Sequence, residues 1–451
     1  MRFATLLVLV TLFAGCAQQP EAPAALAPAP VPEDIRPAIE APTFLPPIEL
    51  GVMDGGAEPS VAVAADGTVY VTTPLALWRS DDGGKSYQPL GAPTCSFGLP
   101  MCPPGSEQYE PGLVGGGDGS LAVTKDGAVH WAGLGSGIPY QRSTDKGETW
   151  SKELDVSDET GSDREWAVVD AWDRLSIQWR GADDDGSGVF IRFSEDSGLT
   201  WGNVTRVADD GRQGPVSIDP VNGSLILAHQ KPGELYVARS DDRGATWTDS
   251  KIRDVAGRPF IFPITAFDAG GTAYLVWSED PNAPDADAVV LEGGRVVSIP
   301  TVFMIVSHDK GVTWGEPVAL STPGVPALLP WIAAGGPGRV AIAWYEGQQP
   351  APANRLPNLF DVKVAVSTSA DAAQPEFAVS QANADPVHVG SFCTEGSACS
   401  LLGGDRSMLD FFEIRLTPEG APVLAWTGDD TVKMQRVKVF ATVMDTGTLL
   451  W

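Results

Sequence analysis

Histidine and basic residues are scarce in this chain of 451 residues. Four histidines leave little room for a metal site built from several imidazoles. The 30 lysines and arginines stand against 58 aspartates and glutamates, which gives a net charge of −28 at pH 7. Such a surface repels nucleic acid and anionic lipid, so neither is expected as a partner. The sequence also lacks H-E-x-x-H, P-loop and G-x-S-x-G patterns, so it offers no zinc-protease, nucleotide-binding or serine-hydrolase motif.

The N-terminal apolar run, residues 3–14, is shorter than the roughly 20 residues that a membrane-spanning helix needs. Its length suits the hydrophobic region of a signal peptide. Residues 12–16, Leu-Phe-Ala-Gly-Cys, resemble a lipoprotein lipobox, which implies lipidation of Cys16. An ordinary cleaved signal is the alternative. We expect a signal peptide over residues 1–15, a lipidated Pro/Ala-rich tether over 16–50, and one domain over 51–451. The domain would then face the extracytoplasmic side of a cell envelope, with lipid as its one membrane contact.

Beyond Cys16, four cysteines form two closely spaced pairs, Cys95 with Cys102 and Cys393 with Cys399. In an exported protein an even number of cysteines favours disulfides. A four-cysteine zinc site is less well supported, because its cysteines usually occur in tighter C-x2-C pairs. We expect two local disulfides, although four cysteines allow three connectivities.

Glycine (50), proline (38) and tryptophan (14) are abundant. The many short apolar runs are separated by turn-forming residues, a pattern typical of an all-β chain. The octapeptide S-x-D-x-G-x-T-W occurs at residues 143–150, 194–201, 240–247 and 307–314, and a looser copy occupies 80–87. Internal repeats of this spacing indicate a propeller or a solenoid. The length therefore predicts one repeat domain rather than several globular ones.

The octapeptide has the chemistry of a hairpin turn. Its Ser and Asp side chains can accept bonds from nearby backbone N–H groups, its Gly takes a positive φ, and its Thr and Trp resume the strand. This repeat resembles the Asp box, or BNR repeat, of the sialidase-like β-propeller superfamily. The resemblance extends over about residues 55–445 and implies structural roles for Asp82, Asp145, Asp196, Asp242, Asp309, Trp150, Trp201, Trp247 and Trp314.

Strand–turn–strand units allow the blades to be counted. Seven occur, at residues 60–71, 121–131, 166–179, 216–227, 264–277, 331–344 and 411–426. We therefore predict an all-β propeller of seven four-stranded blades. Six blades, the commoner number among sialidases, is the alternative, with the last unit as an insertion. Strands near residues 46–50 and 437–443 are expected to share the closing blade, which would remove an open sheet edge.

In a four-stranded meander the octapeptide turns share one face with the turns between strands one and two. Ligand sites are therefore expected on the opposite face, where the longest loops follow residues 277, 345 and 379. The charged and polar candidates there are Glu58, Glu110, Asp163, Arg164, Glu165, His229, Lys231, Arg258, Glu279, Tyr345, Glu346, Arg355, Arg406 and Asp410.

The resemblance to sialidases implies an arginine triad for the substrate carboxylate, a Tyr nucleophile with a Glu partner, and an Asp acid/base. On this chain the catalytic candidates are Tyr345, Glu346 and Asp163, and the ligand-binding candidates are Arg164, Glu165, Arg258, Arg355 and Arg406. The arginines could equally pair with the abundant carboxylates, and Arg164 could bridge to a neighbouring blade. The F/Y-R-I-P segment that supplies the family's first arginine is absent, since residues 48–78 contain no arginine.

The favoured function is thus a surface-tethered, monomeric module that binds an extracellular glycan or protein without sialidase chemistry. A sialidase-like glycoside hydrolase is the alternative. No cofactor or metal is expected. The acidic loops at residues 183–186 and 280–287 could bind a structural Ca²⁺, but they lack EF-hand spacing and are more typical of solvated loops.

Overall fold

A computed structural model describes residues 38–53, 57–73, 76–90, 119–134, 137–158, 161–209, 211–256, 262–281, 291–292, 295–296, 299–350, 358–393, 405–429 and 437–451. Residues 39–451 form one compact unit, and the description below concerns this unit. In the parts of the chain described, every regular element is a β-strand. None of these parts contains a helix long and apolar enough to cross a membrane.

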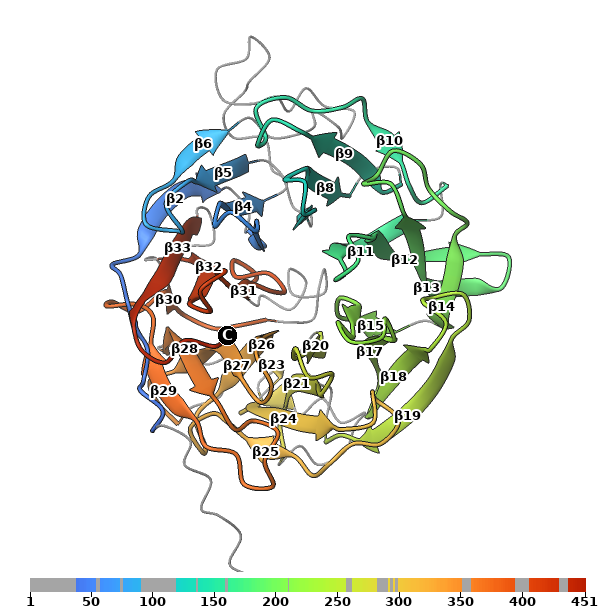
Figure 1. The fold of residues 1–451 in the computed structure, drawn as a ribbon. Coiled ribbons are helices and arrows are strands. Elements are labelled where there is room, and N and C mark those ends of the chain that lie inside the picture. The colour runs from blue at the N-terminus through green and yellow to red at the C-terminus, as the bar shows by residue number, and fades with distance from the viewer. Residues whose placement is uncertain are drawn as a thin grey trace, which may run out of the picture. The chain divides into compact units, whose positions relative to one another are not determined.

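Seven antiparallel sheets stand around a central axis like the blades of a propeller (Figure 1). Blade 1 contains β3 (Ser60–Val63), β4 (Val69–Thr73), β5 (Ala76–Ser80) and β6 (Gln88–Leu90). Blade 2 contains β7 (Gly119–Val123), β8 (Val129–Gly133), β9 (Pro139–Ser143) and β10 (Leu154–Asp155). Blade 3 contains β11 (Gly161–Val169), β12 (Leu175–Asp183), β13 (Gly186–Ser194) and β14 (Thr205–Asp209).

Blade 4 contains β15 (Arg212–Gln213), β16 (Ser217–Ile218), β17 (Leu225–Lys231), β18 (Glu234–Ser240) and β19 (Thr248–Asp254). Blade 5 contains β20 (Ile264–Phe267), β21 (Ala273–Glu279), β24 (Thr301–Ser307) and β25 (Val318–Ala319), with a small hairpin of β22 (Leu291–Glu292) and β23 (Arg295–Val296) between β21 and β24. Blade 6 contains β26 (Ala327–Ala334), β27 (Val340–Gly347), β28 (Leu359–Ser367), β29 (Ala378–Gln381) and β30 (His388–Val389).

Blade 7 joins the two ends of the domain. Its inner strands are β31 (Glu413–Leu416), β32 (Pro422–Gly428) and β33 (Val437–Thr446), and its outer edge is formed by β1 (Thr43–Phe44) and β2 (Ile48–Met53). β2 runs antiparallel to β33, with Ile48 opposite Ala441 and Val52 opposite Lys438. The predictions of seven blades and of a shared closing blade are confirmed. The compact unit begins at Ile39 rather than at residue 51, because β1 and β2 are required to complete this sheet.

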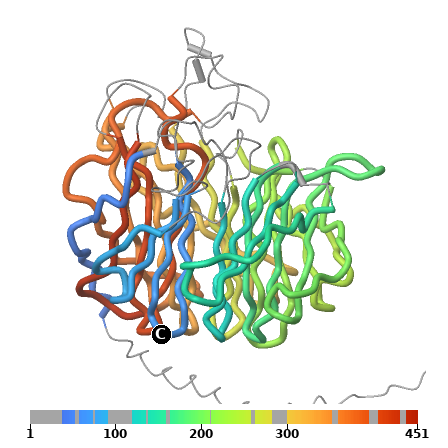
Figure 2. Tube along the Cα trace, turned by 90° about the horizontal axis from the view of Figure 1, so that it is seen from above, coloured from blue at the N-terminus to red at the C-terminus, as the bar shows by residue number. Residues whose placement is uncertain are grey.

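The hydrophobic core lies between the blades. Both faces of a central strand contact neighbouring sheets, so strands such as β21 and β27 are buried along their whole length. In the side view the strands run along the ring axis (Figure 2), and the inner strand of blade 7 contacts that of blade 1. Packing of sheet against sheet around the ring explains why these strands are continuously apolar instead of alternating.

The octapeptide turns connect the third and fourth strands of their blades. In the first full copy, Asp145 accepts hydrogen bonds from the Thr149 backbone N–H (2.9 Å), the Thr149 hydroxyl (2.6 Å) and the Ser143 hydroxyl (2.7 Å). The Gly147 N–H donates to Ser143 Oγ over 2.8 Å, and Gly147 has a φ of +87°. The same set of bonds surrounds Asp82, Asp196, Asp242 and Asp309.

The tryptophans that end these octapeptides pack against the clusters between blades. Each one borders a different cluster, and the four are Trp150, Trp201, Trp247 and Trp314. Trp201, for example, meets the Tyr140 ring edge-on at a centroid distance of 5.0 Å. Each octapeptide thus fixes its own turn and also ties it to the core beside it.

These turns predict acid sensitivity. The Thr149 and Thr246 hydroxyls, followed by backbone N–H groups, lower the pKa of Asp145 and of Asp242 to about 2 from an ordinary value of 3.8. A lowered folded-state pKa stabilises the fold above the unfolded pKa, and this contribution is lost as pH falls from about 4 to about 2. We expect the Tm of the double variant Asp145→Asn/Asp242→Asn to fall less than the Tm of the wild type across this interval.

Thermal melts at several pH values between 2 and 5 measure this difference. Asp184→Asn, at an exposed position outside the turns, is the control and should follow the wild-type profile. Parallel profiles for the double variant and the wild type would contradict the assignment.

Candidate functional site

Four aromatic rings from four different blades meet inside the ring of inner strands. Phe411, just before β31, lies 5.9 Å from Trp166 on β11, 6.3 Å from Phe262 before β20 and 5.6 Å from Trp331 on β26, measured between ring centroids. All four side chains are buried. We call them the aromatic cluster. The cluster brings together chain segments that are distant in sequence.

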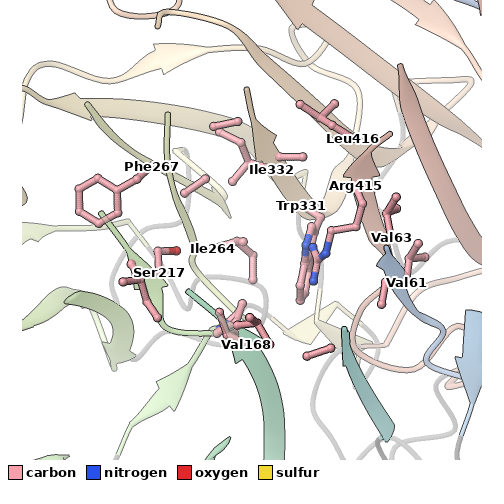
Figure 3. A pocket seen from close by; sticks show the side chains of 18 of the residues that line it. Val61, Val63, Val168, Ser217, Ile264, Phe267, Trp331, Ile332, Arg415 and Leu416 are labelled. Atoms are coloured by element: carbon pink, nitrogen blue, oxygen red, sulfur yellow. The ribbon is translucent and has the colours of Figure 1, made fainter. Parts of the chain in front are cut away.

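A cavity of about 360 Å³ lies beyond the aromatic cluster, toward the face of the octapeptide turns. Its walls are mostly aliphatic residues of the inner strands, with Arg415 as the charged residue of the lining (Figure 3). The Arg415 guanidinium lies 5.7 Å from the centre of the Trp331 ring and 2.8 Å from a carboxylate oxygen of buried Glu413. Burial raises the pKa of Glu413, whereas nearby Arg415 opposes that rise. The Arg415 side chain is thus held in place by Glu413 on its own strand and by Trp331 on β26.

Asp163 and Arg164 lie near the start of β11, and Arg164 contacts the cluster. The Arg164 guanidinium lies 3.5 Å from Asp163 Oδ2 and 5.4 Å from the centre of the Phe262 ring. The register of β11 against β12 shifts between Asp163 and Trp166, and Arg164 has a φ of +56°. At this irregularity Asp163 is partly exposed, while Glu165 is buried. A positive φ in a non-glycine residue requires support from its surroundings.

A second arginine–aspartate pair comes from blade 7. Arg406 and Asp410 form a bidentate pair, with Nη2 donating to Oδ2 over 2.6 Å. The Asp410 N–H donates to Glu58 Oε1 over 3.0 Å, which ties the pair to blade 1. Asp410 directly precedes Phe411 of the aromatic cluster. Two charged pairs thus border the cluster, one from blade 3 and one from blade 7.

We call Asp163, Arg164, Arg406 and Asp410 the channel-mouth residues. Their side chains are between 17% and 38% exposed, so each can meet both solvent and protein. All four were candidates from the sequence, and the structure places both pairs beside the aromatic cluster. The alternative drawn from the sequence, that the arginines pair with nearby carboxylates, describes both Arg164 and Arg406.

Tyr345 and Glu346 lie elsewhere, on β27. Tyr345 is fully buried, and its hydroxyl donates to the Thr427 carbonyl (2.9 Å) and accepts from the Thr427 N–H (3.2 Å). Burial raises the pKa of Tyr345. Glu346 accepts from the Thr322 N–H (3.0 Å), the Thr322 hydroxyl (2.8 Å) and Trp344 Nε1 (2.9 Å). Both groups thus bind protein partners, and the structure does not bring them to the channel mouth.

Three further candidates also have internal partners. His229 is buried, with Nε2 2.8 Å from Asp249 Oδ1 and its ring stacked on Tyr236. Lys231 Nζ lies 4.5 Å from the centre of the same tyrosine ring. Glu279 accepts from the Ala256 N–H over 3.0 Å, and burial raises its pKa. These contacts stabilise blades 4 and 5.

Several predicted residues lie outside the described parts of the chain: Cys16, Cys95, Cys102, Glu110, Arg258, Arg355 and Cys399. Cys393 lies within them, and the two local disulfides stay predictions. Of the two acidic loops, Asp183 pairs with Arg206 over 2.6 Å, and Asp280 Oδ2 accepts from the Ile299 N–H over 3.0 Å. These two carboxylates belong to the acidic loops considered above as calcium sites, and each already has a protein partner.

Sequence reasoning did not find the aromatic cluster. Trp166, Trp331 and Phe411 lie within the strand–turn–strand units used to count the blades, and Phe262 lies two residues before one of them. A large aromatic residue at or just before the inner strand of several blades was the available signal. It could have been found by aligning the repeats on their inner strands.

The site and fold define a seven-bladed β-propeller with a cavity between its inner strands and two arginine–aspartate pairs beside the aromatic cluster. No known sequence family and no curated protein matches the chain. Among solved structures, an ulvan lyase, a polysaccharide lyase bound to a GlcA–Rha3S unit, has a TM-score of 0.50 at 11% identity and covers 87% of this chain and 95% of its own. This likeness supports the propeller fold.

Two other solved structures have lower TM-scores. A Dyadobacter fermentans protein of unknown function matches with a TM-score of 0.43 and 14% identity, over 88% of this chain and 99% of its own. A sialidase from Streptococcus pneumoniae matches with a TM-score of 0.43 and 12% identity, over 89% of this chain and 70% of its own.

Proposed function

We propose that this protein is a surface-tethered β-propeller that binds neutral extracellular glycans at its channel mouth and does not carry out sialidase chemistry. The observation that carries the proposal is the placement of the Asp163–Arg164 and Arg406–Asp410 pairs, both partly exposed, beside the aromatic cluster. Carboxylates accept and guanidinium groups donate hydrogen bonds, so together they suit the hydroxyl groups of a sugar.

The buried pair on β27 supports binding without hydrolysis. A tyrosine nucleophile must reach the substrate, but the Tyr345 hydroxyl is hydrogen-bonded inside the protein to Thr427. Both described channel-mouth arginines already contact carboxylates, and the net charge of −28 opposes an anionic sugar. A neutral glycan does not require an unpaired arginine, and the negative net charge does not repel it.

The ulvan lyase shows that a propeller of comparable fold holds a polysaccharide fragment. For this chain, glycan binding rests on the channel-mouth residues. We further propose that lipid on Cys16 anchors the protein and that the Pro/Ala-rich segment after it holds a monomeric propeller outside the cell. Two disulfides, Cys95–Cys102 and Cys393–Cys399, and the Asp-box relationship of the octapeptides belong to the same proposal. It requires no cofactor.

A glycan array probed with the propeller tests the binding function. We expect signals on neutral glycans that fall about tenfold or more in the Asp163→Asn/Arg164→Ala variant, because charged hydrogen bonds contribute about 1.5–3 kcal/mol each. Arg239 and Asp241 form a similar pair at the octapeptide-turn face. The variant Asp241→Asn/Arg239→Ala is therefore the matched control and should bind like the wild type.

A panel of fluorogenic sialosides separates binding from hydrolysis. The proposal predicts no turnover above the buffer rate. Turnover that survives purification and disappears in Tyr345→Phe would favour the sialidase-like hydrolase instead. Equal loss of array binding in both double variants would remove the channel mouth as the site.

A further inference from the structure

His388, Asp405 and Asp429 converge where blade 6 meets blade 7. One potential donor atom from each residue lies within 4.8 Å of the others. His388 begins β30 of blade 6, Asp429 follows β32 of blade 7, and Asp405 lies in the segment leading to β31. His388 and Asp429 are buried, and Asp405 is partly buried. We propose that His388, through Nε2, and Asp405 bind a divalent transition-metal ion, Zn²⁺ or Mn²⁺, while Asp429 orients the imidazole.

The hydrogen bonds orient the imidazole for this role. His388 Nδ1 lies 2.8 Å from Asp429 Oδ1. When Nδ1 donates to this carboxylate, Nε2 carries the lone pair. A metal-binding histidine commonly donates its other ring N–H to a carboxylate, which fixes both the tautomer and the ring plane. Ser407 Oγ donates to Asp429 Oδ2 over 2.8 Å and so holds the carboxylate in place.

Oxygen donors lie next to His388 Nε2. A β-carbon added to Gly390 would lie 3.4 Å from Nε2 and 3.4 Å from Asp405 Oδ2, so both atoms border the space beside this glycine. The Ser391 carbonyl oxygen lies 3.2 Å from Nε2. An imidazole nitrogen with carboxylate and carbonyl oxygens is a donor set that suits Zn²⁺ and Mn²⁺.

The local charge also favours a cation. Within the described segments, neither Asp405 nor Asp429 pairs with a lysine or an arginine. With a neutral imidazole, the group carries two negative charges in a partly dehydrated place. Buried charges are normally paired or coordinated to a metal. The Phe360 and Phe392 rings, 5.8 Å and 4.9 Å from the imidazole centre, restrict water on one side of it.

Bound there, the ion would connect β30 of blade 6 to the segment that carries Arg406 and Asp410. It would therefore have a structural role beside the channel mouth. This inference is independent of glycan binding, because it rests on a different set of residues. The four histidines of the sequence do not exclude it, since the site uses only one of them.

Metal content and thermal stability test the proposal. The full propeller is stripped with a chelator, incubated with ZnCl2, MnCl2 or CaCl2, desalted and measured by mass spectrometry. We expect about one equivalent of Zn²⁺ or Mn²⁺ and a higher Tm in its presence. Asp405→Asn should lose this equivalent and the Tm shift. The asparagine can still accept from the Ser407 N–H as Asp405 does, so the variant should fold.

Asp429→Asn should weaken metal binding by about 10–100-fold, the usual effect of removing a carboxylate that orients a histidine ligand. His229→Gln is the matched control, because His229 also lies 2.8 Å from an aspartate but belongs to no such cluster among the described residues. It should keep the bound metal. Absence of metal from the folded wild type, an equivalent retained by Asp405→Asn, or binding of Ca²⁺ alone would overturn the proposal.

Discussion

A chain that starts at residue 55 is expected to melt about 10 °C or more below a chain that starts at Ile39. The two differ only in β1, β2 and their flanks, which form the outer edge of blade 7. Five residue pairs join β2 to β33. At about 1 kcal/mol for each hydrogen bond, their loss removes roughly 5 kcal/mol. A change of this size lowers Tm by about 2 °C or more per kcal/mol in a large domain.

The shorter chain also exposes β33 as an open edge. Unpaired edge strands bind other chains, so we expect aggregates as well as a lower Tm. Differential scanning fluorimetry gives the first quantity and size-exclusion chromatography the second. Because both chains lack residues 1–38, the comparison isolates the closing strands. Equal melting temperatures and elution profiles would show that the ring does not depend on this closure.

Phe411→Ala is expected to destabilise the propeller by about 3–5 kcal/mol, the range for truncation of a buried aromatic side chain. Phe411 contacts three other rings, from blades 3, 5 and 6. Removing it leaves a cavity where four blades meet, and rigid sheets cannot collapse to fill it. Phe411→Leu retains most of the volume and should be destabilised less.

Urea unfolding followed by tryptophan fluorescence and circular dichroism measures this effect. Trp172→Ala is the control, because Trp172 is 47% exposed and its removal should change stability by only about 0.5 kcal/mol. A loss for Phe411→Ala no larger than that of the control would show that the aromatic cluster does not stabilise the ring.

The features predictable from sequence are those encoded locally. Asp145 receives its hydrogen bonds from residues at most four positions away, so a short motif is sufficient to specify the turn. Seven repeats of a strand–turn–strand unit then predict seven blades. The closing blade was also predictable, because an unpaired strand at each end of a repeat array is best paired with the other.

The site depended on contacts that no local pattern contains. Tyr345 lies within the buried strand β27, and its burial depends on Phe392 and Phe412, which come from segments distant in the chain. Arg164 has a positive φ in a strand whose register shifts, a local distortion that no short sequence pattern specifies. Side-chain types identified the channel-mouth residues, but only the arrangement of the blades brought them together.

The position of β33 between β32 and β2 also constrains how the protein folds. Ile48 meets Ala441, so the contact that closes the ring joins residues near opposite ends of the domain. During synthesis blades 1 to 6 can form before β33 exists, whereas β2 has no partner until nearly the whole chain has been made. Contacts of such sequence separation form slowly. We therefore expect ring closure to be a late folding step, and the unclosed intermediate to be the species most prone to aggregation.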